Sequence, residues 1–497
     1  MGTLLLPILF LPVLLVPIIY VLGIKIGKRV GWVTLFPLVC ISSVIILLIP
    51  KVTEEHLIIE EYVWAPIIDL KLGLLIDGLS LPALITLTLV FTAAASYSIR
   101  YMERRVNEEH KAETRPAYAA YYALFLIYFA GVMGAILATN LIEFYIFYEL
   151  AVLGPWALIY AYGYGKRGKI ALTFFIWTHI GAVSLLIGIL LTGWRINSYS
   201  ISDLRLLNGD PMAIWVATAI LICFMIKMAI VGLHPWLPGT YAEAPAPISA
   251  AIGATSVVFG TYAVVRFLTP IRDAIFGFSG WLELWALVTI AYGGFMALAE
   301  NDTKRLVAFL SMSQMNYCLL GAFTYTIAGT LGAVSYSLSH GLAIALLFLA
   351  TGAVFHKTGT RDMGRLGGLA PKMPFIILSS IIGFFTIGGV PPTIGFKSKF
   401  VLVAGAFDRA FISSPLELLV AMGAVMITMV TIAYELWAVW RIFYGKLPNS
   451  LRDVKESPLT MSVAVLVLAL TSLILGIWPA VIMDPLEFVV TKLFGVH

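Results

Sequence analysis

The sequence predicts an all-α membrane protein with about 14 transmembrane helices, ten of which form two inverted five-helix repeats that each contain a broken helix. Three observations predict this class. Of the 497 residues, 60% are hydrophobic and only 12% are charged, against roughly 45–50% and about 25% in an average soluble protein. Apolar runs of spanning length recur along the whole chain. The basic residues concentrate in alternate loops, as a membrane imposes.

The composition leaves little chain outside the membrane. Fourteen helices of about 20 residues use roughly 300 residues, so the loops average about a dozen residues. Such loops exclude a nucleotide-binding fold, an iron–sulfur domain or a large catalytic module. The three cysteines, Cys40, Cys223 and Cys318, lie in apolar runs without CxxC spacing, which indicates neither a metal cluster nor a disulfide framework. We expect no cofactor, no metal and no nucleic-acid partner.

The predicted spans follow one another closely. Residues 1–116 form an N-terminal three-helix segment with spans at 4–23, 31–50 and 72–99. Residues 117–268 form the first five-helix repeat, with spans at 117–138, 140–163, 169–193, 212–233 and 247–268. Residues 281–443 form the second repeat, with spans at 281–298, 303–325, 328–356, 374–405 and 416–443. The last span is 459–481. The apolar N-terminus is longer than a signal peptide and has no cleavage pattern, so it is taken as the first span.

The loop charges test this count independently. With both termini outside, 21 of the 32 Lys and Arg residues fall on the cytoplasmic side, 8 fall outside and three lie within spans. A missed helix would scramble this asymmetry beyond the point of the error, because cytoplasmic loops carry the basic residues. The sequence therefore predicts a multi-pass protein of the plasma membrane with both termini outside.

Two predicted spans contain helix breakers at matching positions. Span seven runs through Lys227 into residues 232–239 (GLHPWLPG), and span twelve contains residues 388–392 (GGVPP) before Lys397 and Lys399. Each is the fourth helix of its repeat. Broken helices at equivalent places in inverted repeats point to an ion or substrate path. The alternative is that Pro and Gly are simply common in membrane helices.

Glu149 and Lys227 are the first of the ionisable residues that stand out within spans. A charge at the bilayer centre costs about 2.5–3.5 kcal/mol, so it persists only when it is paired, hydrated or functional. Glu149 lies at the centre of span five, and Lys227 is its natural partner. Such a pair is switchable, as a proton relay requires. The alternative is a protonated glutamic acid that is hydrogen-bonded between helices.

Three further residues complete the predicted relay. His340 lies near mid-depth of span eleven, and imidazole exchanges protons near neutral pH; a hydrogen-bonded core histidine is the alternative. Lys399 follows the second break. His234, in the first break, is a secondary candidate, as a proton carrier or as a structural cap. Glu435 and His179 are weaker candidates, and Glu143 and Asp77 lie near enough to the interfaces to be ordinary.

These residues, together with residues 301–314 (NDTKRLVAFLSMSQ) and 359–369 (GTRDMGRLGGL), resemble the antiporter-like subunits of respiratory complex I, of Mrp sodium/proton antiporters (the D-type subunit) and of membrane-bound hydrogenases. The resemblance covers essentially the whole chain. It implies a fourteen-helix fold with two inverted repeats. It carries the glutamate–lysine pair onto Glu149 and Lys227, the central histidine onto His340 and the terminal lysine onto Lys399.

The chain departs from this pattern at two positions. Many members have a bridging lysine in span eight, where the register set by Arg266 and Phe267 gives Val258. Others have a lysine four residues after the span-eleven histidine, where this chain has Ile344. Proton transfer from Lys227 to Lys399 would then depend on His340 and on water near the hydroxyls of Thr255, Ser256 and Thr261.

Two functions from different classes follow. The first is an ion-translocating subunit for protons, sodium ions or both. It would lie in the bilayer beside other membrane subunits. Either peripheral redox subunits or an opposing ion gradient would drive the ion transport. It would carry no redox site of its own and would belong to a membrane-bound oxidoreductase or an antiporter. The second is a non-pumping paralogue with a structural, coupling role, which the absent lysines favour.

Overall fold

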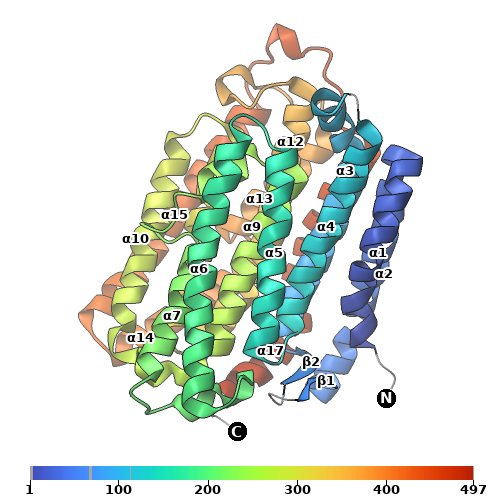
Figure 1. Cartoon of the computed structure of the whole chain (residues 1–497). Coiled ribbons are helices and arrows are strands. Elements are labelled where there is room, and N and C mark those ends of the chain that lie inside the picture. The colour runs from blue at the N-terminus through green and yellow to red at the C-terminus, as the bar shows by residue number, and fades with distance from the viewer. Residues whose placement is uncertain (1–3, 67–69, 112, 496–497) are drawn as a thin grey trace.

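The computed structural model describes residues 4–66, 70–111 and 113–495. Its helices stand side by side in one bundle, with the β1–β2 hairpin and α17 at the same end (Figure 1). We call this the hairpin end; the loop charges predict that it faces outside. The predicted position of both termini falls partly on residues 1–3 and 496–497, which lie outside the described residues.

The predicted all-α membrane class is confirmed. Eleven segments of the described chain are long and apolar enough to cross a membrane. The first, Leu5–Glu55, contains two helices, α1 and α2. The remaining predicted crossings correspond to two broken helices, α7–α8 and α13–α14. Each broken helix is the fourth in its set of five, as the sequence predicts.

The N-terminal segment contains α1 (Leu5–Ile26), the 3₁₀ turn η1 (Gly27–Arg29), α2 (Val30–Glu55) and α3 (Ser80–Glu109). The expected start of span three at residue 72 is wrong, because an antiparallel hairpin of β1 (Leu57–Ala65) and β2 (Leu70–Asp77) lies before α3. The side chains of β1 alternate between more and less exposed positions, the pattern of a half-covered strand.

The hairpin is fastened to the start of α1 through Glu60. Its carboxylate accepts hydrogen bonds from the backbone N–H groups of Leu4, Leu5 and Leu6, at 2.6, 3.0 and 3.2 Å. Partial burial would raise the pKa of Glu60, but these donors and the Tyr62 hydroxyl outweigh it and hold that pKa below its usual value. The first N–H groups of α1, which have no partner within the helix, are thereby satisfied.

The first five-helix set contains α4 (Thr114–Leu137), α5 (Leu141–Tyr162), α6 (Arg167–Ile196), the broken helix α7 (Ala213–Lys227) with α8 (Leu237–Glu243), and α9 (Ala246–Ala263). The 3₁₀ helix η3 (Ile201–Leu207) joins α6 to α7, and the π-helical turn η4 (Val264–Leu268) continues α9. Two 3₁₀ turns, η5 (Thr269–Ala274) and η6 (Phe276–Phe278), lead to the second set.

The second set contains α10 (Ser279–Ala299), α11 (Thr303–Phe323), α12 (Ile327–Thr358), the broken helix α13 (Pro374–Gly388) with α14 (Ile394–Ile412), and α15 (Pro415–Phe443). The 3₁₀ turns η7 (Met363–Arg365) and η8 (Asn449–Leu451) lie in its connections. The last predicted span ends early: α16 (Leu459–Ile477) stops before Pro479, and a separate helix α17 (Ala480–Leu493) follows.

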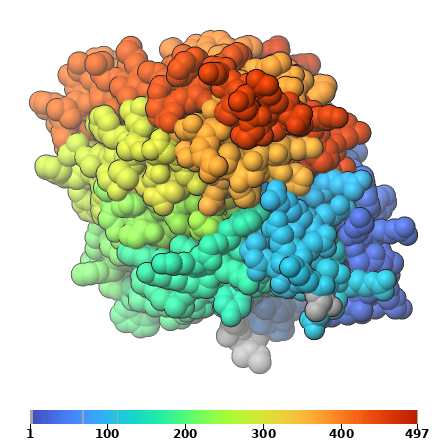
Figure 2. Space-filling model, turned by 90° about the horizontal axis from the view of Figure 1, so that it is seen from above, coloured from blue at the N-terminus to red at the C-terminus, as the bar shows by residue number. Residues whose placement is uncertain are grey.

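Helices α9, α11 and α12 form the centre of the molecule and are almost entirely buried. Seen from the end opposite the hairpin, the first set (teal to green) lies along one side and the second (yellow to orange) along the other, with the N-terminal helices (blue) at one end (Figure 2). The central helices therefore lie where the two sets meet, and α12 carries His340 into that contact.

Candidate functional site

The first break interrupts the helix at Lys227. Residues 228–236 leave the helical path with a positive φ at Ala229 (49°) and at Gly232 (95°). The carbonyls that the break frees find side-chain donors: Asn316 Nδ2 donates to Met228 O at 3.1 Å, and Trp236 Nε1 donates to Ile226 O at 3.0 Å. An unwound helix persists within a bundle only when its backbone is satisfied in this way.

The second break places Lys399 at the end of α13. The glycine after that helix, Gly389, adopts a left-handed conformation with φ 77°. The freed carbonyl of Ile387 accepts hydrogen bonds from Lys399 Nζ at 3.1 Å and from the Tyr336 hydroxyl at 2.8 Å. The ammonium thus lies at the negative end of the α13 dipole, where a cation is stabilised.

Neutral groups hold Lys399 directly. Its side chain is 4% exposed, and Nζ donates to Gln314 Oε1 at 2.8 Å and lies 4.4 Å from the centre of the Tyr317 ring. The Gln314 amide is oriented by its own bonds, which it donates to the hydroxyls of Ser313 and Thr431. These oxygens and ring faces can solvate an ammonium without fixing it in an ion pair.

Glu435 is a buried acid beside the second break. It lies on α15, it is 2% exposed, and its carboxyl packs against Gly388 at the end of α13. Its Oε1 has no hydrogen-bond partner among the described residues. Glu435, a weaker candidate by sequence, therefore belongs to the surroundings of the second break.

Lys227 is buried among aromatic rings. It is 2% exposed, and its Nζ lies 5.6 Å from the centre of the Tyr148 ring and 5.9 Å from that of Phe259. No ion pair joins Lys227 to Glu149 in the part of the chain that the structure describes. Tyr148, the neighbour of Glu149 in sequence, faces the lysine instead.

Glu149 contacts α6. Its Oε1 lies 3.8 Å from Nδ1 of His179, and the side chains are 21% and 47% exposed respectively. Both residues lie near the middle of their helices, where an exposed charge is costly in lipid. The structure thus brings Glu149 to His179, which sequence reasoning ranked low, and leaves it apart from Lys227.

His340, on α12, is fully buried. Its Nε2 lies 3.3 Å from the Ser311 carbonyl oxygen and 3.4 Å from the Ser311 hydroxyl. Its Nδ1 has no partner within the described residues. The imidazole therefore has one nitrogen anchored and one free to exchange a hydrogen bond.

Buried hydroxyls without partners lie on the helices around His340. Within the described ranges, Tyr241, Ser256 and Thr261 have no hydrogen bond from the side-chain hydroxyl. Thr255, in contrast, accepts from the Tyr128 hydroxyl at 2.9 Å. Buried polar atoms normally have partners, and ordered water is the usual one where the protein supplies none.

Val258 and Ile344 occupy the contact between α9 and α12. Val258 packs against Gly341, directly after His340 in sequence, and Ile344 packs against Gly253. Both are almost fully buried. The positions of the absent lysines are therefore filled by aliphatic side chains beside the histidine.

His234 lies in the first break, away from the fully buried groups. Its Nδ1 accepts a hydrogen bond from the Gly232 N–H at 3.2 Å, and its ring lies 5.2 Å from that of Tyr292. Its contacts are thus with the backbone of the break and with α10.

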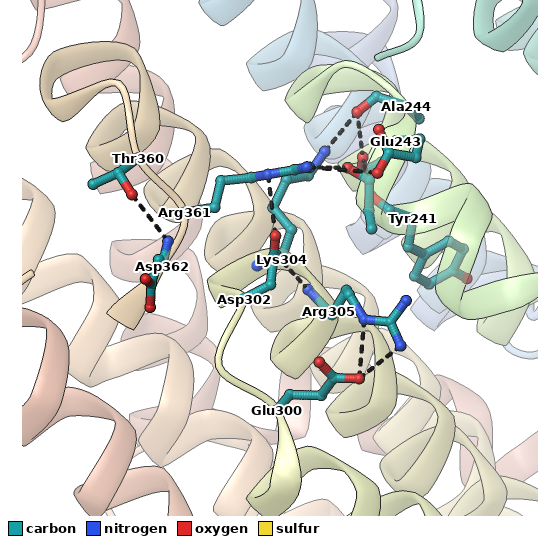
Figure 3. Close-up of polar contacts among 12 residues, drawn as sticks. Tyr241, Glu243, Ala244, Glu300, Asp302, Lys304, Arg305, Thr360, Arg361 and Asp362 are labelled. Carbon is teal, nitrogen blue, oxygen red and sulfur yellow. Dashed lines mark hydrogen bonds and ion pairs between the residues drawn. The ribbon is translucent and has the colours of Figure 1, made fainter. Parts of the chain in front are cut away.

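A cluster of charged residues holds the C-terminal end of α8, the end farther from the first break (Figure 3). Lys304, which is 1% exposed, donates to the Ala244 carbonyl at 2.5 Å, and Arg361 donates to the Ala242 carbonyl at 2.6 Å. Arg361 also lies 3.1 Å from Asp302 and 3.5 Å from Glu243. Two segments that carry the family resemblance thus meet at the last turn of α8.

A buried ion pair at the hairpin end was not predicted from the sequence. Arg266 Nη2 lies 2.6 and 2.7 Å from the two oxygens of Asp77, beside a cavity of about 830 Å³. Burial would raise the pKa of Asp77, but Arg266 and the N–H groups of Ser80 and Leu79 lower it below its usual value. Asp77 therefore stabilises the fold through a buried ion pair, in addition to lying near a predicted membrane interface. Glu143 fastens the same hairpin, accepting from the Gly73 N–H at 3.2 Å.

The sequence did not predict which neutral residues contact the candidate site: Gln314 at Lys399, Ser311 at His340 and Tyr336 at the second break. They are neutral, and a sequence does not show which face of α11 or α12 meets a lysine. The signal that could have found them is a run of polar residues in a helix predicted to cross the membrane: Ser311, Ser313, Gln314 and Asn316 all lie within α11 and are buried.

Comparisons with known proteins agree with this arrangement. The family model described as "NADH:quinone oxidoreductase/Mrp antiporter, TM" matches residues 138–431, which is more than half of the chain. F(420)H(2) dehydrogenase subunit M of Methanosarcina mazei is 28% identical over 443 residues, covering 86% of this chain and 84% of that protein.

Solved structures share the fold. A chain of the Mrp complex from Dietzia sp. superposes with a TM-score of 0.87 at 21% identity, covering 99% of this chain and 97% of that one. A chain of respiratory complex I from Thermus thermophilus gives a TM-score of 0.85 at 24% identity, covering 99% and 100%.

Proposed function

We propose, on the premise that this chain belongs to the NADH:quinone oxidoreductase/Mrp antiporter membrane family, that it is an ion-translocating subunit of a multisubunit membrane complex. The ion is a proton, a sodium ion or both. Other membrane subunits lie beside it, and redox chemistry or an opposing gradient on other subunits supplies the energy. The chain's own residues supply the path.

The observation that carries the proposal is the pair of buried lysines at the two breaks. Lys227 ends α7, and Lys399 caps the end of α13. Neither lysine forms an ion pair within the described residues: Lys227 lies among rings, and Lys399 is held by a carbonyl, an amide and rings. A buried ammonium without a direct ion pair keeps much of its desolvation cost. Small changes in its surroundings therefore decide whether it keeps its proton, and this sensitivity is what a relay needs.

Between the lysines, the proposed path runs through His340. The unpartnered hydroxyls of Tyr241, Ser256 and Thr261 mark where water would connect Lys227 to the imidazole. Ser311 holds Nε2 of His340, and Gln314, three residues later on α11, holds Lys399. Because Val258 and Ile344 bring no charge to this stretch, water and hydroxyl groups have to carry the proton there.

Glu149 is proposed as the switch at the entrance. It now lies beside His179. If its carboxylate turned toward Lys227, it would stabilise the protonated lysine, and turning back would release that proton. His234 is assigned a secondary part, at the backbone of the first break.

The test is ion flux into proteoliposomes containing the purified complex. Lys227→Ala and Glu149→Gln should each reduce flux to that of protein-free vesicles while the complex stays assembled. Glu113→Gln, an exposed acid on the α3–α4 connection, is the matched control and should leave flux unchanged. Normal flux in both Lys227→Ala and Glu149→Gln would rule out the assigned path.

A second candidate function, structural coupling without pumping, is favoured by Val258 and Ile344. Two aliphatic side chains fill positions beside His340 that a bridging lysine would need. Under the pumping proposal, Val258→Lys or Ile344→Lys changes the flux, because a new ammonium enters the path. Under the coupling alternative, neither substitution changes flux while the complex keeps its other activity.

A further inference from the structure

A buried charged cluster outside the proposed path lies at the hairpin end of the second helix set. It consists of Glu283 on α10, Arg409 near the end of α14 and Glu417 at the start of α15. The three residues are 0%, 6% and 7% exposed. Arg272, in the preceding turn, lies 5.0 Å from the Phe494 ring just after α17, which connects this region to the hairpin end.

Arg409 and Glu417 are each held by groups other than Glu283. Arg409 Nη2 donates to the Ser279 hydroxyl at 3.2 Å, and its guanidinium lies 4.0 Å from the centre of the Phe276 ring. Glu417 accepts a hydrogen bond from the Ser414 hydroxyl. Its other oxygen packs so closely on Gly280 that a Cβ there would lie 2.6 Å from it.

The side-chain carboxyl of Glu283 has no hydrogen bond within the described residues, although both of its oxygens are buried. Glu283 lies on α10 one turn after Ser279 and Gly280, the residues that Arg409 and Glu417 contact, so it belongs to the same cluster. Tyr325, from the α11–α12 connection, lies near the same cluster: its ring centre is 6.2 Å from that of Phe276, the ring that the Arg409 guanidinium covers.

Unpaired donors lie in the same cluster. The Nε of Arg409 and the hydroxyl of Tyr325 are buried and lack partners in the part of the chain described. Donors and acceptors that are both unpaired, and near one another, indicate a small species between them that completes their hydrogen bonds.

The net charge of the cluster indicates the charge that this small species must carry. Two carboxylates and one guanidinium leave one uncompensated negative charge in a buried site, which is strongly unfavourable. A proton removes it by neutralising one carboxyl, which then becomes a hydrogen-bond donor. A metal cation would have to sit beside Arg409, whose charge repels it.

We propose that Glu283 and Glu417, with Arg409, share one proton and form a proton-holding site at the hairpin end. Resting on the proposed function, this site is the acceptor between Lys399 and the outside. Arg409 follows Lys399 by ten residues on α14, about 15 Å along the helix. The groups that face the shared proton are Arg409 from α14, Glu417 from α15 and Tyr325 from the α11–α12 connection.

The test reads the protonated carboxyl directly, by its infrared C=O band in the purified complex at neutral pH. The difference between the infrared spectra of the wild type and of Glu283→Gln should show that the variant has lost the band of one protonated carboxyl. Glu417→Gln should lose it too, because Glu283 and Arg409 then balance each other. Arg409→Gln should gain a second protonated carboxyl. Glu300→Gln, at the opposite end and paired with Arg305, is the control and should leave the band unchanged.

Each other outcome overturns the proposal. Sodium binding that Glu283→Gln abolishes, with no carboxyl band, assigns the site to a metal cation. An unchanged band in folded Glu283→Gln and Glu417→Gln shows that the carboxyls are ionised. Because the band is measured without ion flux, it stays interpretable if the Lys227 and Glu149 variants refute translocation.

Discussion

At the scale of single residues, scarcity of charge makes the candidate site visible in the sequence. Lys227, Lys399, Glu149 and His340 stand out because few ionisable groups lie in the spans. Their partners could not be predicted in the same way. Glu149 contacts His179, and Lys399 contacts Gln314, 85 residues away in sequence. Such contacts depend on how helices rotate and pack, which the pattern of one helix does not determine.

Asp77 offers a prediction on stability. Asp77→Asn leaves the buried Arg266 guanidinium without its carboxylate, which costs about 3–5 kcal/mol. We expect a clearly lower thermal midpoint in detergent at neutral pH. Asp210→Asn, which breaks an exposed pair with Arg195, is the matched control and should lower the thermal midpoint much less, because water screens exposed pairs. Equal effects of the two substitutions would contradict the structural role of the Asp77 pair.

The same pair predicts a pH dependence. The folded-state pKa of Asp77 is depressed, so its contribution to stability is complete above the unfolded pKa of about 3.9 and is lost as the pH falls through the folded value. The gap in thermal midpoint between wild type and Asp77→Asn should therefore stay constant from about pH 5 to 8 and narrow below about pH 4. A gap that persists unchanged in acid would show that Asp77 acts without its charge.

At the scale of helices and strands, Gly and Pro residues predicted the helix breaks, and the length of the apolar runs predicted the spans. The Gly–Pro segments predicted both broken helices in their correct places, because these residues interrupt a helix locally. The hairpin was missed because residues 72–77 are as apolar as a span and lie against a spanning helix. The separate α17 was missed for a related reason: apolar residues continue past Pro479 while the helix ends.

The crossing of α12 and α14 carries a prediction on packing. A Cβ at Gly405 would lie 2.0 Å from the backbone nitrogen of Gly329. Gly405→Ala forces the helices apart and should cost about 1–3 kcal/mol, seen as a lower thermal midpoint. Gly277→Ala, where the added Cβ would meet no atom within 4 Å beyond the neighbouring residues of the chain, should have no comparable effect. Equal midpoints for the two variants would mean that the close approach is not needed.

At the scale of the whole molecule, the chain is a bundle whose two helix sets meet along the buried helices α9, α11 and α12. His340 lies on α12, in the contact between the two sets. Hydropathy predicts the number of crossings, and the loop charges predict the side that each loop faces. Neither predicts which subunits lie beside the chain, because interfaces in the membrane carry no comparable compositional signal. Proteins that copurify in mild detergent would identify the complex.

The most direct test of the ion path is proton and sodium flux in proteoliposomes that contain the purified complex with Lys399→Ala or Lys397→Ala. Lys399 is buried at the second break, whereas Lys397, two residues earlier on α14, is exposed. The proposed path predicts that Lys399→Ala reduces flux to that of protein-free vesicles, while Lys397→Ala retains the wild-type rate. Equal flux in the two variants, with the complex intact, would contradict it.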